Sequence, residues 1–143
     1  MSTQLRSVGS VLVDSGAWAA LANAADRNHT EAVAIRRGIE RSRARLFGTN
    51  FLVDETYTLM LARLGYRFAV RFLDELRASS LTIIRIEPRD EHQAEQILRQ
   101  FDDKRFSYTD ATSFAVMERL GIEAAFTFDK NFTEYGRVQV FTP

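Results

Sequence analysis

The sequence predicts an α/β fold in which a mostly parallel sheet carries helices on both faces. Short apolar runs such as "SVLVD" (10–14) and "LTIIRI" (81–86) are typical of buried strands. Longer segments with helical periodicity lie between such runs, and this alternation favours a covered parallel sheet. The length of 143 residues fits a single domain, 1–143, and we expect residues 1–9 to form a short flexible segment.

In the N-terminal half, apolar spacing and capping residues predict the order of the elements. Ile35 and Ile39 fall on one side of a helix. A later helix can begin at Thr49 or Asn50, which are good N-cap residues, and is stopped by Gly65. The expected elements are a strand at 10–14, helices at 15–25 and 28–45, a very short strand at 46–48, and a helix at 49–65.

The C-terminal half continues the alternation. Pro88 and Asp90 favour a helix start, and Ser107 is a good N-cap for a helix that Gly121 stops. The expected elements are a helix at 66–79, a strand at 81–86, helices at 90–101 and 107–121, and strands at 124–129 and 138–141.

Composition excludes several classes of protein. The chain has no cysteine, which excludes disulfides and thiolate metal sites and favours a reducing compartment. We find no signal peptide and no apolar run long enough for a membrane span, so we expect a cytoplasmic protein. The formal net charge of zero does not indicate a nucleic-acid binder. GxGxxG, Walker A and DxDxT motifs are absent, which argues against a nucleotide cofactor.

Three aspartates are expected at one edge of the sheet. Asp14 and Asp129 each end a predicted strand, and Asp110 lies in the first turn of the helix before the second of these strands. If the two strands are neighbours, all three side chains face the rim where open α/β sheets bind ligands. Each also has a simpler interpretation as a cap: Asp14 of its helix, Asp110 in a capping box with Ser107, and Asp129 of the turn "KNF" (130–132).

Glu55 is harder to explain as a structural residue. Its helical neighbours are mostly apolar, and a carboxylate among them needs compensation, either from one of the 17 arginines or from a metal ion. Three aspartates and one glutamate form an oxygen ligand set that suits Mg²⁺ or Mn²⁺ better than Zn²⁺. Such sites also take substrate phosphates, so phosphodiester hydrolysis is the reaction that fits best.

The chain also resembles a known family. Its motifs are similar, in order and spacing, to the acidic motifs of PIN-domain ribonucleases, and above all to VapC-like toxins of bacterial toxin–antitoxin pairs. The similar segments run from about Val11 to the C-terminus: "VLVDSGAW", "TNFLVDETYTLM", "DDKRFSYTDATSFAVMERLGI" and "AFTFDKNF". The resemblance implies that Asp14, Glu55, Asp110 and Asp129 hold Mg²⁺ or Mn²⁺ for RNA cleavage. It further implies a PIN-like sheet, a homodimer, and an antitoxin that blocks the site.

Other residues have two interpretations each. The resemblance implies an assisting role for Ser15 beside the first aspartate, whereas Asp103 either contacts the metal or supports the helix entrance. Trp18, Phe51 and Phe114 are expected in the core rather than as base-stacking platforms. A basic arc in "RRGIERSRAR" is either a solvated helix face, the commoner case, or a contact for RNA or antitoxin: Arg36, Arg37, Arg41, Arg43 and Arg45.

The sequence therefore predicts a metal-dependent endoribonuclease that serves as the toxin of a toxin–antitoxin pair. A housekeeping RNA-processing nuclease is one alternative. The other is a non-catalytic PIN module that binds RNA or protein, with its carboxylates held by arginine side chains. No motif encodes the RNA target, because single-stranded contacts and surface shape decide it.

Overall fold

A computed structural model describes residues 8–141, so residues 1–7 of the expected flexible segment 1–9 lie outside it. Within this range the elements alternate as the sequence predicts. Their order is β1 (Ser10–Val13), α2 (Ser15–Ala22), α3 (His29–Ser42), β2 (Arg45–Thr49), α4 (Asn50–Leu64), α5 (Tyr66–Ala78), β3 (Thr82–Ile84), α6 (Pro88–Gln100), α7 (Tyr108–Leu120), β4 (Ala124–Phe126), α8 (Lys130–Tyr135) and β5 (Gln139–Phe141). None of these helices is both long and apolar enough to cross a membrane.

The five strands form one parallel sheet in the order β3-β2-β1-β4-β5. This confirms the predicted fold class, and it confirms that the first strand and the strand after α7 are neighbours. The chain leaves β1 for β2 on one side and later returns to β4 on the other. The strand order therefore reverses at β1, and the carboxyl ends of β1 and β4 border the crevice where α/β sheets bind ligands.

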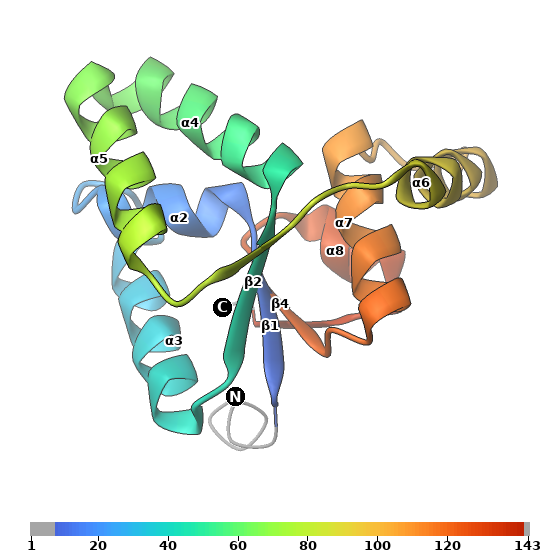
Figure 1. Ribbon diagram of the computed structural model, residues 1–143, viewed down its shortest axis with the longest axis horizontal. Helices are drawn as coiled ribbons and strands as arrows, with labels where there is room; N and C mark the ends of the chain where they lie inside the picture. The colour runs from blue at the N-terminus through green and yellow to red at the C-terminus, as the bar shows by residue number, and fades with distance from the viewer. Residues whose placement is uncertain (1–7, 142–143) are drawn as a thin grey trace.

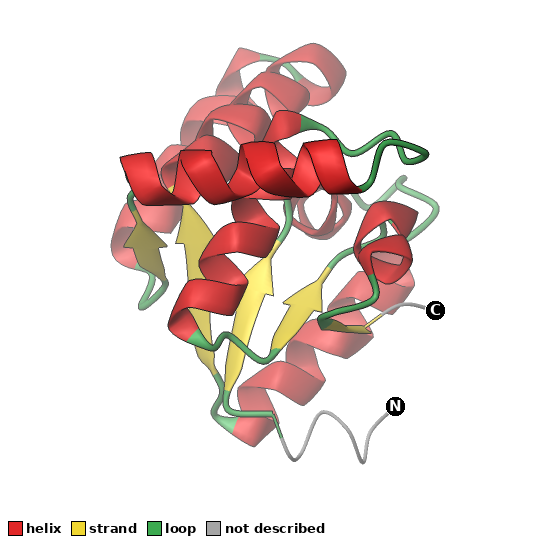
Figure 2. Ribbon diagram, turned by 90° about the vertical axis from the view of Figure 1, so that its right-hand side faces the viewer, coloured by secondary structure: helices red, strands yellow, loops and turns green. Residues whose placement is uncertain are grey.

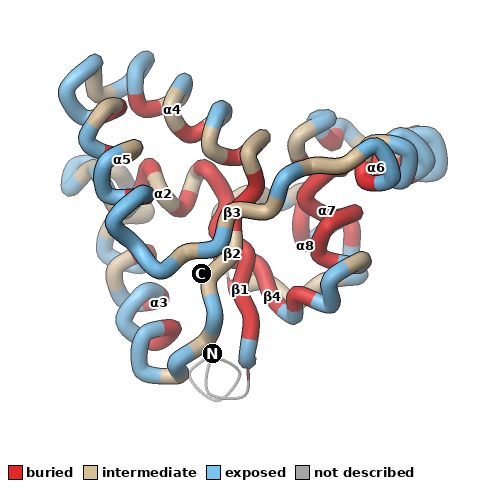
Figure 3. Tube along the Cα trace, in the orientation of Figure 1, coloured by how far each residue is buried: buried red, intermediate tan, exposed pale blue. Residues whose placement is uncertain are grey.

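Helices cover both faces of the sheet. Figure 1 shows α2, α3 and α5 on one side and α6, α7 and α8 on the other, and Figure 2 shows the strands between helices in front and behind. Successive residues of β1 point to opposite faces. Leu12 packs in the core that contains Phe114 of α7, while Val11 and Val13 pack in the core that contains Ile35 of α3. Figure 3 accordingly shows β1 and α7 as buried.

Several predicted boundaries are wrong, and the structure gives a reason for two of them. β4 ends at Phe126 instead of Asp129, because Phe126 is the last residue paired with β1, where it lies opposite Val13. The expected turn after Asp129 is the helix α8. α3 ends at Ser42 because Arg43 adopts a left-handed conformation with φ of 58°.

Other elements are shorter or longer than predicted. α2 ends at Ala22 rather than at residue 25, with Asn23 as its C-cap. β2 spans five residues instead of the three expected at 46–48, and β3 covers three of the six residues of "LTIIRI".

A buried ion pair that the sequence analysis missed joins α6 to α7. Asp90 is 1% exposed, and its two carboxylate oxygens accept hydrogen bonds of 2.6 and 2.9 Å from Arg119. Burial alone would raise the pKa of Asp90, but the Arg119 bonds and the Glu87 amide lower it below the usual value. The pair stabilises the ionised form of Asp90 in the contact between the two helices.

We expect Arg119→Met to lower the free energy of unfolding by about 3 kcal/mol, because it leaves the buried carboxylate of Asp90 without a counter-charge. Urea denaturation at pH 7 measures the loss. Arg99→Met is the matched control, since the Arg99–Glu95 pair is exposed and should change stability by less than about 0.5 kcal/mol. Equal effects of the two variants would contradict the prediction.

Candidate active site

The carboxyl edge of the sheet brings together the four acidic side chains that the sequence predicts. Asp14 follows β1, Asp129 precedes α8, Asp110 lies in the first turn of α7, and Glu55 lies in α4. In a parallel sheet a helix that follows a strand begins at this edge, and α7 runs back from it toward the start of β4 (Figure 1). The negative charges are close enough to act on one another. Burial is the largest cause of the raised pKa of Asp14, and the charges of Asp110 and Glu55 raise it further. The pKa of Glu55 is likewise raised by burial and then by Asp110 and Asp129.

Asp14 is the most deeply buried of the four. It is 3% exposed, and its Oδ2 accepts a 2.8 Å hydrogen bond from the hydroxyl of Thr127. Burial, with a smaller effect of the neighbouring carboxylates, raises the pKa of Asp14 to about 7, although the hydrogen bond from Thr127 lowers it. Asp14 occupies the N-cap position of α2, yet its side chain accepts no capping hydrogen bond. The simpler interpretation of Asp14 as a helix cap is therefore wrong.

Asp110 and Asp129 are helix caps, as their positions in the sequence suggest. Asp110 completes the predicted capping box: its Oδ2 accepts from the Ser107 amide at 3.1 Å, and its own amide donates to Ser107 Oγ at 3.0 Å. Asp129 Oδ1 accepts from the amide of Asn131 at 2.9 Å. Within residues 8–141 these bonds leave Oδ1 of Asp110 and Oδ2 of Asp129 without a donor. Capping and ligand binding are thus compatible at both positions.

Glu55 is half-buried and accepts a hydrogen bond of 2.5 Å at Oε1 from the hydroxyl of Ser15. Burial raises its pKa first, and the nearby carboxylates raise it further. In the part of the chain that the structure describes, none of the four acids forms an ion pair with a basic residue. Compensation by arginine, the structural alternative for Glu55, is therefore not found there.

These side chains fit a hydrated divalent cation. Their donors are all oxygen atoms, and the charge that they share has no counter-charge among residues 8–141. The same residues contain no group of three or more His, Asp or Glu side chains already arranged around one point as a complete ligand set. Mg²⁺ usually keeps several of its waters and takes only one or two carboxylates directly. An ion held partly through water therefore suits this arrangement.

Two polar residues that orient the carboxylates were missed by the sequence analysis. Thr127 is fully buried and donates to Asp14, and its Oγ1 also accepts from the amide of Asp129 at 3.0 Å. Asn131 Nδ2 donates to Asp110 Oδ2 at 3.0 Å. Both residues lie within two positions of Asp129 in "FTFDKN", and this proximity was the signal that could have identified them.

We expect Thr127→Val to weaken metal binding about 10- to 100-fold, because it removes the donor that orients Asp14 and opposes the rise of its pKa. Isothermal titration with Mn²⁺ measures the affinity. Thr56→Val is the matched control: Thr56 is equally buried, but its hydroxyl donates to Leu52 O in its own helix. Weaker binding in both variants would assign the effect to general loss of packing instead.

The remaining predicted residues lie elsewhere. Asp103 has a side chain that is 72% exposed and lies 3.5 Å from Lys104 Nζ. The basic arc is not a single helix face, because Arg43 is the C-cap that follows α3 and Arg45 begins β2. Arg45 pairs with Ser10 at the start of β1, at the opposite end of the strand from Asp14. Arg37 and Arg41 are exposed on α3.

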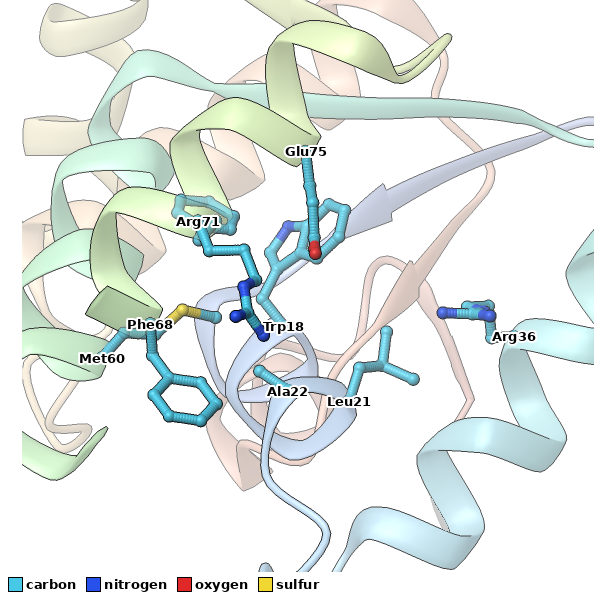
Figure 4. A pocket seen from close by; sticks show the side chains of 9 residues that line it. Trp18, Leu21, Ala22, Arg36, Met60, Phe68, Arg71 and Glu75 are labelled. Carbon is cyan, nitrogen blue, oxygen red and sulfur yellow. The ribbon is translucent and has the colours of Figure 1, made fainter. Parts of the chain in front are cut away.

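Arg36 of the same arc borders a hollow between α2, α3, α4 and α5. Figure 4 shows Trp18 and Met60 in this hollow, with Arg36, Arg71 and Glu75 around them. Arg36 also lies 3.3 Å from Glu40 in an exposed ion pair. None of the four clustered carboxylates lines this hollow, so it is a surface separate from the acidic site.

Known proteins share this sequence pattern and fold. Residues 11–138 match the PIN domain family. The chain is 38% identical over 133 residues to the 23S rRNA-specific endonuclease VapC20 of Mycobacterium tuberculosis, covering 91% of this chain and 97% of that protein. The crystal structure of that VapC20, described as a sarcin–ricin loop cleaving toxin, has a TM-score of 0.82 at 34% identity and covers 92% and 98% of the two chains. A toxin–antitoxin complex from Klebsiella pneumoniae shares the fold, with a TM-score of 0.67 at 16% identity. The match covers 94% of this chain and 98% of that chain.

Proposed function

The chain belongs to the PIN domain family, and from this membership we propose that it is an endoribonuclease that hydrolyses RNA phosphodiester bonds with Mg²⁺ or Mn²⁺. The observation that carries the proposal is the cluster of Asp14, Glu55, Asp110 and Asp129 without a basic partner in residues 8–141. Carboxylates that raise one another's pKa in this way gain from a bound cation.

The residues of the site have separate tasks in this proposal. The four acids hold the ion, directly or through water, while Ser15, Thr127 and Asn131 orient Glu55, Asp14 and Asp110 through the hydrogen bonds described above. Ser107 fixes the start of α7. The ion supplies charge neutralisation at the phosphate and a lowered pKa of coordinated water. Asp103 stays outside the set because its carboxylate faces Lys104.

The biological role proposed is that of the toxin of a toxin–antitoxin pair. It is supported by the identity of 34–38% with a protein described as a 23S rRNA-specific endonuclease and as a toxin that cleaves the sarcin–ricin loop. We accordingly propose structured ribosomal RNA as the substrate class and the cytoplasm as the place of action. A housekeeping RNA-processing nuclease would cut RNA without any antitoxin.

An antitoxin protein and a second copy of the chain are the proposed partners. Within the basic arc, Arg36 lines the hollow whose walls include Trp18 and Met60, where an acidic partner segment can be bound (Figure 4). We expect Arg36→Glu to weaken binding of the proposed antitoxin by about tenfold, measured by titration. Arg37→Glu is the matched control, and equal weakening in both variants would contradict a specific role for Arg36.

Cleavage of a synthetic sarcin–ricin loop hairpin and of total ribosomal RNA tests the activity. The purified protein is incubated with Mn²⁺, with Mg²⁺ and with a chelator. Defined cuts that require the metal support the proposal. If calorimetry detects no metal binding and no RNA is cut, the non-catalytic module is the better description.

A further inference from the structure

An aromatic pair lies on the two helices that also carry Glu55 and Asp110, and one of its rings is exposed. The rings of Phe51 and Tyr108 are stacked, with their centroids 6.3 Å apart and an angle of 29° between their planes. Phe51 lies one helical turn before Glu55 on α4, and Tyr108 lies two residues before Asp110 on α7. The pair thus connects the two helices that carry half of the acidic site.

This pair differs from the other aromatic contacts around α7. Phe106, Phe114 and Tyr135 are at most 8% exposed and pack together in the core. Tyr108 is 39% exposed, and Phe51 is half-buried, so the expectation that Phe51 is a core residue is only partly met. Accessible aromatic rings offer a flat surface on which an unpaired nucleobase can stack.

The surroundings of Tyr108 favour a base over a phosphate as the ligand. Its hydroxyl donates a 3.0 Å hydrogen bond to Glu95 Oε2 of α6, which fixes the orientation of the ring. The negative charge of Glu95 repels a phosphate at this position. An uncharged nucleobase can instead extend the stack of the two rings, as unpaired bases do on aromatic side chains in RNA-binding proteins.

We propose that Phe51 and Tyr108 form a stacking platform for an unpaired base next to the phosphate that the acidic site holds. The platform rests on the proposed function, because the metal ion that the acids would hold binds the phosphate, and the rings bind the neighbouring base. It selects RNA in which that base is unstacked, such as a hairpin loop, over a continuous duplex.

Single substitutions test the platform by steady-state cleavage of the sarcin–ricin loop hairpin. Tyr108→Leu and Phe51→Leu are expected to raise KM about 5- to 100-fold with little change in kcat, since stacking holds the base before and during the reaction. Tyr108→Phe keeps the ring but loses the hydrogen bond to Glu95, so its KM should lie between those of the wild type and Tyr108→Leu. Tyr66→Leu is the control for loss of an exposed aromatic residue, because Tyr66 is 62% exposed and lies on α5.

Stacking is measured separately from catalysis in the Asp110→Asn background. A hairpin with 2-aminopurine in the loop should lose fluorescence on binding, and Tyr108→Leu should prevent the loss. If the wild type cleaves RNA and both leucine variants keep its KM, the platform is overturned while the proposed function stands. If no RNA is cut but the quenching depends on Tyr108, the platform stands without the catalysis. A leucine variant whose native mass falls from dimer to monomer would overturn the platform in favour of a subunit contact.

Discussion

Asp110→Asn is expected to abolish metal-dependent cleavage while the protein stays folded. The side-chain oxygen of asparagine can still accept the hydrogen bonds of the Ser107 amide and Asn131 Nδ2, so the start of α7 is preserved. The other oxygen, which has no donor within residues 8–141, is replaced by an amide that cannot bind a cation. We expect the cleavage rate to fall by more than about 100-fold. This decrease is larger than the one that follows removal of a residue that only orients a metal ligand.

The measurement is the cleavage rate of the sarcin–ricin loop hairpin at saturating Mn²⁺, with circular dichroism to verify the fold. Asp74→Asn is the matched control, because Asp74 is exposed on α5 and should leave the rate unchanged. Full activity of Asp110→Asn would show that Asp110 is only a helix cap, and the proposed metal site would then be wrong.

Asp14 is expected to make the metal-free protein less stable as the pH rises. Its folded pKa of about 7 lies above the usual aspartate value of 3.8, so folding takes up a proton between these two values. The contribution of Asp14 to stability is complete below about pH 4 and is lost as the pH rises through about 7. The difference between 3.8 and about 7 corresponds to up to about 4 kcal/mol, at about 1.4 kcal/mol for each pKa unit.

Urea denaturation in chelator from pH 5 to pH 8 measures this dependence. Asp14→Asn should flatten the profile and be more stable than the wild type at pH 8, because the neutral amide avoids the burial of a charge. Mn²⁺ at pH 8 should restore stability to the wild type but much less to the variant. Asp74→Asn should behave as the wild type does. If the free energy of unfolding changed with pH in the same way in the wild type and in Asp14→Asn, another group would control this pH dependence.

Much of the fold could be predicted because the signals are local. The apolar run before Asp14 reads as a strand buried on both faces, and the structure places it at the centre of the sheet. The capping box of Ser107 and Asp110 spans three residues, and it forms as predicted. The end of β4 was predicted three residues too late, because its position depends on pairing with Val13 more than a hundred residues away.

By itself, the sequence determined the order of the strands and of the described helices except α8, and it pointed to the four acids of the proposed site. Such features depend on residue type and on contacts within a few positions. Only the tertiary structure decided which hydrogen bonds orient the acids: Thr127 reaches Asp14 across 113 positions, and Ser15 reaches Glu55 across 40. It also decided that Arg45 lies at the far end of β1 from Asp14. These contacts form only when distant segments pack together, and no periodicity or spacing along the chain encodes them.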